Sequence, residues 1–285
     1  MAWDSLPNAL LYSWSLIFGA VLGSFGNVLI HRLPRDQSIV KPASRCPHCG
    51  HRVRAFDNIP VISYLILRGK CRDCGESISI RYPLIELASG LLFMSAAIGF
   101  GWSLATLFYG LLLVALLVLS IIDIEEQWLP WVITFPMTAV GLIGSAIGAT
   151  LPFIDSLIGG AAGLAFFGFV ALFGLIVKRE TMGGGDIVFG LMAGTFLGWE
   201  MTFLMIFLAC LLGLLAHLHL VVFVFLRAFR LIRRDREIKP IVFGQFLSIG
   251  TVLVIFWGDR ILSVGTTWSL IIGDKIAAFI FRIFW

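Results

Sequence analysis

Charged residues are scarce in this sequence. Only 13% of its 285 residues are charged and 59% are apolar, and the mean hydropathy is +0.97. Such values exclude an ordinary soluble domain and are typical of a polytopic membrane protein. The sequence also lacks internal repeats and low-complexity tracts. The first residues carry no basic segment, and no small-residue cleavage site follows the first apolar run, so no cleavable secretion signal is expected.

Apolar segments long enough to cross a bilayer as helices, about 20 residues each, recur along the chain. They lie at 9–31, 83–100, 103–122, 131–150, 156–177, 187–199, 201–226 and 240–257. The sixth is short and joins the seventh through a tight turn at Gly198-Trp199-Glu200. The sequence therefore predicts an all-α membrane protein with about eight transmembrane helices. The tail 260–285 contains Asp274, Lys275 and Arg282, which favour an interfacial helix over a ninth span.

The distribution of lysine and arginine predicts the orientation. The segment 32–82 holds ten of the 21 basic residues, and other basic residues lie at 178–179 and 227–239. With eight spans all eighteen fall on one side of the membrane, which the positive-inside rule makes cytoplasmic. The predicted division of the chain is a first span (1–31), a cytoplasmic loop (32–82), a membrane domain (83–259) and an interfacial tail (260–285).

Two acids are predicted to meet at this cytoplasmic side. Asp123 ends the third span, and Asp186 opens the sixth after Gly183, Gly184 and Gly185. Carboxylates at membrane depth are costly and usually functional. Two carboxyls that share a proton form the acid–base pair of an aspartyl protease. The glycines would let a substrate backbone approach Asp186 closely.

Structural roles are the alternative for each acid. Asp186 before an apolar run could be a helix N-cap. Asp123 fits a purely structural role less well, because a negative charge at a helix C-terminus opposes the helix dipole. Glu86 follows Pro83 in a first helical turn and is expected to be structural. Glu125 and Glu126 are expected to face solvent.

Four of the five cysteines form two C-x2-C pairs, Cys46-Pro-His-Cys49 and Cys71-Arg-Asp-Cys74, with 21 residues between them. Four thiolates at this spacing can close a tetrahedral zinc site. A cytoplasmic location argues against disulfides. We expect structural Zn²⁺ in the loop 32–82, with His48 and His51 as loop residues. Cys210, within the seventh span, is expected to be buried.

These motifs together resemble the type IV prepilin peptidases, a group of GxGD intramembrane aspartyl proteases. Ile122-Asp123 with Leu129-Pro130 is similar to the first aspartate motif of the family, and Gly183-Gly-Gly-Asp186 to the second. The segments that resemble other family signatures are Gly19–Pro34, the tetracysteine loop from Ser44 to Glu86, and Pro240–Phe246. The likeness extends over almost the whole chain.

The resemblance implies an enzyme of the bacterial inner membrane, in contact with membrane lipid, that cuts the basic leader from prepilins or pseudopilins. Its active site would lie near the cytoplasmic face, with Asp123 and Asp186 catalytic. Members with the tetracysteine loop typically also methylate the new N-terminus with S-adenosylmethionine. No nucleic-acid partner is implied.

This chain differs from many family members at two positions: Val188 stands where many have lysine, and Trp131 where aspartate or asparagine is frequent. We expect Trp131 to affect packing more than chemistry. Three alternatives stay open. A proton-coupled transporter would also keep carboxylates at membrane depth; a membrane scaffold would need only the cysteines; and the peptidase could lack methyltransferase activity.

Overall fold

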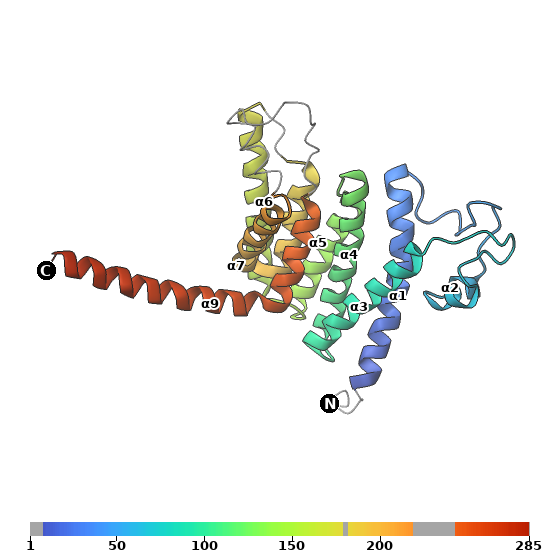
Figure 1. The fold of residues 1–285 in the computed structure, drawn as a ribbon, viewed down its shortest axis with the longest axis horizontal. Helices are drawn as coiled ribbons and strands as arrows, with labels where there is room; N and C mark the ends of the chain where they lie inside the picture. The colour runs from blue at the N-terminus through green and yellow to red at the C-terminus, as the bar shows by residue number, and fades with distance from the viewer. Residues whose placement is uncertain (1–7, 179–181, 219–242, 285) are drawn as a thin grey trace.

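The structure, a computed structural model, describes residues 8–178, 182–218 and 243–284. These residues form helices and loops, without a β-strand beyond two isolated bridges, Arg45 with Arg52 and Lys70 with Ser77. The long helices are α1 (Asn8–Arg32), α3 (Arg81–Phe100), α4 (Leu104–Glu126), α5 (Trp131–Ala146), α6 (Phe153–Ile176), α7 (Gly184–Ala216) and α9 (Gly244–Phe284). Short helices η1 (Leu33–Arg35), η2 (Ala55–Asn58) and α2 (Ile62–Ile66) lie between α1 and α3 (Figure 1).

Six of the described helices are long and apolar enough to cross a membrane: α1, α3, α4, α6, α7 and α9 up to Val264. The apolar helix α5 is shorter and contains Pro136. The prediction of an all-helical polytopic membrane protein is confirmed. Residues 219–226 of the expected seventh span, and the basic segment 227–239, lie outside the described residues.

Helix α7 contains two of the expected spans, because the chain reverses at Gly198. This residue has non-helical angles, φ 74° and ψ 173°, a left-handed φ that glycine adopts without strain. Beyond it, a Cβ built on Gly258 of α9 would lie 2.7 Å from the sulfur of Met201, and one on Gly213 would lie 3.6 Å from Phe246. The second half of α7 therefore runs antiparallel to α9 and returns to the end of the bundle where α7 began. The predicted turn between the sixth and seventh spans is at this position.

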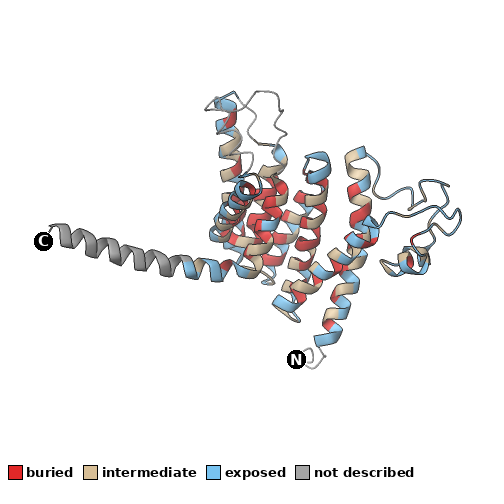
Figure 2. Ribbon diagram, in the orientation of Figure 1, coloured by how far each residue is buried: buried red, intermediate tan, exposed pale blue. Residues whose placement is uncertain are grey.

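Helix α4 lies at the centre of the bundle. Its apolar window is 61% buried, against 22–39% in the other candidate spans. Figure 2 shows the buried residues gathered along α4 and the helices that face it. The fully buried side chains on this helix include Leu112, Leu113, Leu116, Leu119 and Ile122. Burial on all sides gives the last turn of α4, which carries Asp123, a fixed position in the fold.

Helices α6 and α7 approach each other through glycine. A Cβ on Gly163 would meet the carbonyl oxygen of Gly190, and a Cβ on Gly159 would lie 2.6 Å from the Cα of Gly198. Ser156 also donates a 2.7 Å hydrogen bond across this interface to the carbonyl of Thr195. Small residues that allow close backbone approach are a common way to join helices in lipid. This contact positions the first half of α7, at whose start Asp186 lies.

The C-terminal helix α9 continues to Phe284 beyond its membrane-spanning part and extends away from the bundle (Figure 1). The interfacial role expected for residues 260–285 stays a prediction, as does the four-part division of the chain.

Cys210 differs from expectation, because it is exposed among the described residues. Its place on the outside of the second half of α7 makes it a residue of the apolar surface.

Candidate active site and metal centre

The fold brings Asp123 and Asp186 to the same end of the helix bundle. Asp123 lies in the last turn of α4, and Asp186 is the third residue of α7. The two carboxyl groups are close enough for their charges to interact. Asp123 is 6% exposed, and Asp186 is partly buried. Two acids distant in the sequence therefore share one weakly hydrated region.

The carboxyl group of Asp123 is incompletely satisfied. The backbone N–H groups of Gly244 and Gln245, at the start of α9, face it. Its Oδ2 atom, however, is buried and accepts no hydrogen bond from the described residues. A buried oxygen without a partner is costly and uncommon, and it indicates a group that acts on something else, such as a proton or a substrate.

The structural alternative for Asp186, a role as the N-cap of α7, is wrong in its position. The N-cap is Gly183, and Asp186 is at the third helical position. Its carboxyl group faces the backbone N–H of Gly183, as the acid of a capping box does. Asp186 thus stabilises the start of the helix and keeps its carboxyl near Asp123 at the same time.

Leu129 joins the segments that carry the two acids. A Cβ on Gly185 would lie 2.7 Å from the Cβ of Leu129, and a Cβ on Gly244 would lie 3.1 Å from its Cδ1. The Gly244 Cβ would also lie 2.6 Å from Oδ2 of Asp123. Sequence reasoning assigned Gly244 to a family motif but not to the site. The signal in the sequence was the pair Gly244-Gln245, but the sequence did not show which residues this pair contacts in the fold.

The other acids have separate environments. Glu125 pairs with Arg81 at 2.6 Å and ties the end of α4 to the start of α3. Glu126 is exposed, and Glu200 is exposed near the turn in α7. Glu86 accepts a 2.8 Å hydrogen bond from the backbone N–H of Val61. None of these carboxyl groups has the arrangement found at Asp123 and Asp186.

The four loop cysteines form one cluster. Their sulfur atoms all lie within 4.8 Å of one another, and those of Cys46 and Cys74 are 3.8 Å apart. Ligands of a tetrahedral site with metal–sulfur bonds of about 2.3 Å are themselves about 3.8 Å apart. The cluster therefore fits a metal ion held by four sulfurs. His48 and His51 are not among the described residues that could hold it.

The two cysteine pairs have the same local geometry. The N–H of Gly50 donates to the carbonyl of Cys46, and the N–H of Gly75 donates to that of Cys71, each at 2.9 Å. Both glycines have a left-handed φ, 72° and 74°. The N–H groups of Cys49 and His48 also point at the sulfur of Cys46 and lower its pKa to about 6. Burial and the neighbouring sulfurs raise the pKa values of Cys49 and Cys74. A thiolate is the form that binds metal, so without a metal ion the backbone geometry favours the ligand state at Cys46.

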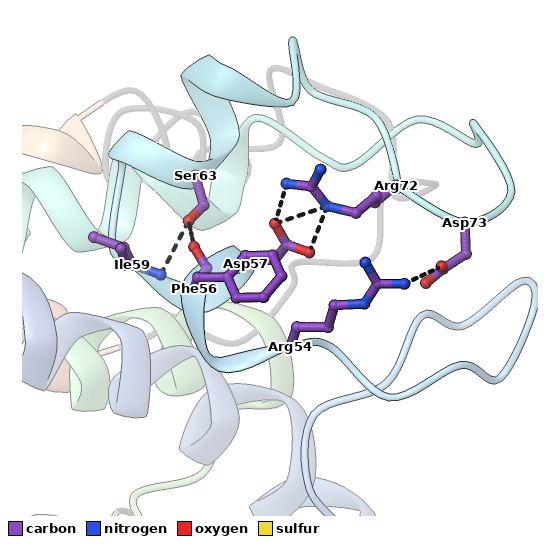
Figure 3. A network of polar contacts seen from close by, with 7 residues as sticks. All are labelled: Arg54, Phe56, Asp57, Ile59, Ser63, Arg72 and Asp73. Carbon is purple, nitrogen blue, oxygen red and sulfur yellow. Dashed lines mark hydrogen bonds and ion pairs between the residues drawn. The ribbon is translucent and has the colours of Figure 1, made fainter.

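Two ion pairs connect the loop around the cluster (Figure 3). Asp57 accepts from Arg72, which follows Cys71, at 2.6–3.1 Å. Arg54 pairs with Asp73 at 3.1 Å. Phe56 lies near both cations, 6.0 Å from the guanidinium of Arg54 and 5.4 Å from that of Arg72. The segment that follows the first cysteine pair is thereby bound to the second pair, which holds the four sulfurs together.

Comparison with known proteins identifies the family. Residues 17–100 match the family model described as Bacterial Peptidase A24 N-terminal domain, and residues 110–218 match the Type IV leader peptidase family. The second match contains both Asp123 and Asp186, and the first contains the four cysteines. The chain belongs to the type IV leader peptidase family.

Relatives in this leader peptidase family agree over most of their length. A prepilin leader peptidase/N-methyltransferase of Stutzerimonas stutzeri is 37% identical, and the alignment covers 87% of this chain and 91% of the relative. One of Pseudomonas putida is 34% identical over 90% and 94%. One of Myxococcus xanthus is 42% identical over 70% and 61%. No solved structure matches the chain.

The two departures from frequent leader peptidase residues have structural consequences. Val188 is buried, 8% exposed, in the first half of α7, so no cation stands two residues after Asp186. Trp131 packs on the glycine loop, with its Cζ2 3.4 Å from where a Cβ of Gly184 would be. Trp131 thus contacts the segment that positions Asp186, which is a packing role.

Proposed function

We propose that this chain is a membrane aspartyl peptidase that cuts the leader from type IV prepilins or pseudopilins. The observation that carries the proposal is the meeting of Asp123 and Asp186 at one end of the bundle, with an unsatisfied oxygen on Asp123. The Type IV leader peptidase match over residues 110–218 and the names of the relatives support it.

The chemistry follows from two carboxyl groups that share a proton. A water molecule lies between them, and the ionised carboxylate removes its proton as the water oxygen bonds to the scissile carbonyl carbon. The protonated carboxyl donates its proton to the carbonyl oxygen. Collapse of this intermediate breaks the C–N bond, and the leaving amine takes up a proton from the pair. No covalent enzyme intermediate forms, and either aspartate can begin as the acid.

The proposed setting is the bacterial inner membrane, with the aspartates near its cytoplasmic face. The ten basic residues of 32–82 and Lys178 adjoin the same helix ends as Asp123 and Asp186, and the positive-inside rule places that side in the cytoplasm. The apolar helix of the substrate enters from the lipid, and its basic leader remains outside the bilayer. Gly183, Gly184 and Gly185 give an extended leader backbone room near Asp186.

The loop 32–82 is proposed as a structural zinc domain. Cys46, Cys49, Cys71 and Cys74 supply the four sulfurs that zinc prefers in closed sites, and the cluster geometry supports this assignment. The chain is also proposed to methylate the new N-terminal amine, since its relatives are named N-methyltransferases. S-adenosylmethionine would supply the methyl group.

The decisive experiment is cleavage of a prepilin by purified protein in liposomes. Asp123→Asn and Asp186→Asn should each abolish cleavage, while Glu125→Gln, which alters the ion-paired neighbour, should remain active. Membrane insertion and helix content should be unchanged in all three. Near-normal cleavage by Asp186→Asn would mean that Asp186 only stabilises the start of α7, and it would overturn the proposed catalytic pair.

Measurements of metal content and of methylation test the proposed zinc site and the methyltransferase activity separately from the peptidase activity. The purified chain should hold about one zinc, and a variant with all four cysteines changed to serine should hold none. Mass spectrometry of the cut pilin in the presence of S-adenosylmethionine should show less methylation by that variant, with cleavage retained. Full zinc content in the variant would exclude these ligands, and unmethylated product from the unmodified enzyme would leave a peptidase alone.

A further inference from the structure

The loop between α1 and α3 exposes an apolar surface, here called the α2 patch. Its residues have side chains 45–69% exposed and are Phe56, Ile59, Ile62, Leu65 and Ile66. The rest of the loop is strongly polar, with ten basic residues in 32–82. Large apolar side chains gathered on an otherwise polar module mark an interaction surface.

The position of the α2 patch is set by a contact with a membrane-spanning helix. Val61, which precedes α2, donates its backbone N–H to Glu86 at 2.8 Å. Glu86 lies in the second turn of α3, about 7.5 Å along the helix axis from Arg81. Val61 has a φ of 61°, a strained value for a β-branched residue, so the contact holds a conformation that the chain would not adopt alone. The loop is thus held beside the start of the span, and Figure 1 shows α2 to the side of α1 and α3.

The neighbouring surface of α3 is apolar and exposed in the same way. Ile80, Leu84, Leu87 and Leu91 recur at helical spacing on one face and are 41–60% exposed. In a helix that crosses a bilayer such a face contacts lipid. Glu86, which holds Val61, lies on a different side of α3, towards α1, but at the same depth as Leu84 and Leu87. A lipid surface that covers the first turns of α3 therefore also reaches the level of the patch.

The charges next to the α2 patch are basic. Arg68 and Lys70, directly after α2, are exposed. The nearby acids Asp57 and Asp73 are engaged by Arg72 and Arg54. Glu76 is also exposed, and its neighbour Ser77 bridges to Lys70, but two cations against this one acid leave the charge beside the apolar side chains positive. A positive charge complements anionic lipid headgroups.

We propose that the α2 patch inserts into the headgroup layer of an anionic bilayer and that Arg68 and Lys70 bind the lipid phosphates. Short amphipathic segments bind membranes in this way, with apolar side chains at the boundary of the acyl chains and cations at the headgroups. The contact does not depend on the peptidase or methyltransferase activity. It holds the cysteine cluster against the membrane surface.

Photo-crosslinking in the full-length protein tests the contact. Benzoylphenylalanine replaces Leu65 in the patch or, as a control, Glu76, which is exposed two residues after the second cysteine pair. The protein is placed in nanodiscs of equal parts phosphatidylethanolamine and phosphatidylglycerol. Lipid adducts found by mass spectrometry should be several-fold more abundant at position 65 than at 76. Equal yields, or adducts at 65 with a second copy or with added prepilin instead of lipid, would overturn the proposal.

The hydrogen bond to Glu86 and the lipid charge provide two further controls. Glu86→Ala removes the acceptor of the Val61 N–H and should lower the adduct yield at position 65 several-fold, while Glu86→Gln keeps an acceptor and should retain the yield. Nanodiscs of phosphatidylcholine alone should give fewer adducts than anionic ones, and the Arg68→Gln, Lys70→Gln double variant should lose this difference. Equal yields in the two lipid mixtures would refute the role of the anionic headgroups.

Discussion

Gly244 sets the closest packing around the proposed catalytic pair. A single methyl group at this position would lie 2.6 Å from Oδ2 of Asp123 and 3.1 Å from Leu129. Because Leu129 also packs on Gly185, a shift there moves both segments that carry the acids. The residue therefore matters for geometry, although it has no side chain to take part in chemistry.

Gly244→Ala should lower kcat/KM for prepilin cleavage by about 100-fold, the effect of a misplacement of about 1 Å in a catalytic group. Gly168→Ala is the matched control, because a Cβ there meets nothing within 4 Å. If both variants cut prepilin at the same rate, Gly244 has no positioning role.

The ion pair of Asp57 with Arg72 gives a pH prediction for the loop. The hydrogen bonds from Arg72 lower the pKa of Asp57 below its ordinary value of 3.8. A lowered native pKa means that the pair contributes fully above the unfolded pKa and loses its contribution as pH falls through the native pKa. From pH 5 to 8 the contribution should therefore be constant.

Asp57→Asn should lower the hydrogen-exchange protection factors of residues 54–73 several-fold, by the same factor throughout pH 5–8. The matched control is Asp73→Asn, which breaks a pair whose acid is 28% exposed, against 8% for Asp57, and should have a smaller effect. A protection difference that grows or vanishes between pH 5 and 8 would contradict the assigned direction of the pKa shift.

Among the elements, the contact of α6 with α7 is the most sensitive to side-chain size. The backbones approach at Gly163 and Gly190 without space for a Cβ. Membrane helices gain no hydrophobic driving force from each other, so close van der Waals packing carries much of their association.

Gly163→Ala should destabilise the bundle by about 1–3 kcal/mol through overpacking. The fall in Tm in detergent should be roughly 2–12 °C for a chain of this size. Gly168→Ala in the same helix should leave Tm unchanged or slightly raised, because it adds a methyl group in open space. An unchanged Tm in Gly163→Ala would show that the two helices separate without cost.

At the scale of the whole molecule, the charges around the proposed site are more balanced than the sequence indicates. Asp123, Asp186, Glu125 and Glu126 lie near one another in the fold, but Glu125 is paired with Arg81 at 2.6 Å. The attraction for a basic leader therefore comes mainly from Glu126 and from the single negative charge that Asp123 and Asp186 share. A unit charge pair at 4 Å contributes about 4 kcal/mol at an effective dielectric of 20, and salt screens more distant loop charges.

Cleavage should be fastest for a prepilin with its leader lysines intact, slower with glutamine in their place, and slowest with glutamate. The effect should appear chiefly in KM and diminish at high salt. The measurement is steady-state cleavage of the three substrates in liposomes. Equal rates for all three would leave the apolar helix and the cleavage-site glycine as the recognition elements.

The sequence by itself determined the all-helical membrane fold, because apolar runs of this length satisfy their backbone groups only as helices in lipid. The spacing of the two cysteine pairs likewise predicted their meeting, since a short loop leaves them few other arrangements. The reversal at Gly198 was also predicted, from a glycine followed by polar and aromatic residues between two apolar runs.

Only the tertiary structure decided how the site is built. The contact of Gly244 with Asp123, the link through Leu129 and the pairing of Glu125 with Arg81 join residues of different helices. The same is true of the Val61–Glu86 contact that positions the α2 patch. Hydropathy and motif spacing describe one segment at a time, whereas these contacts depend on how helices pack against each other, which is fixed by the shapes of many side chains together.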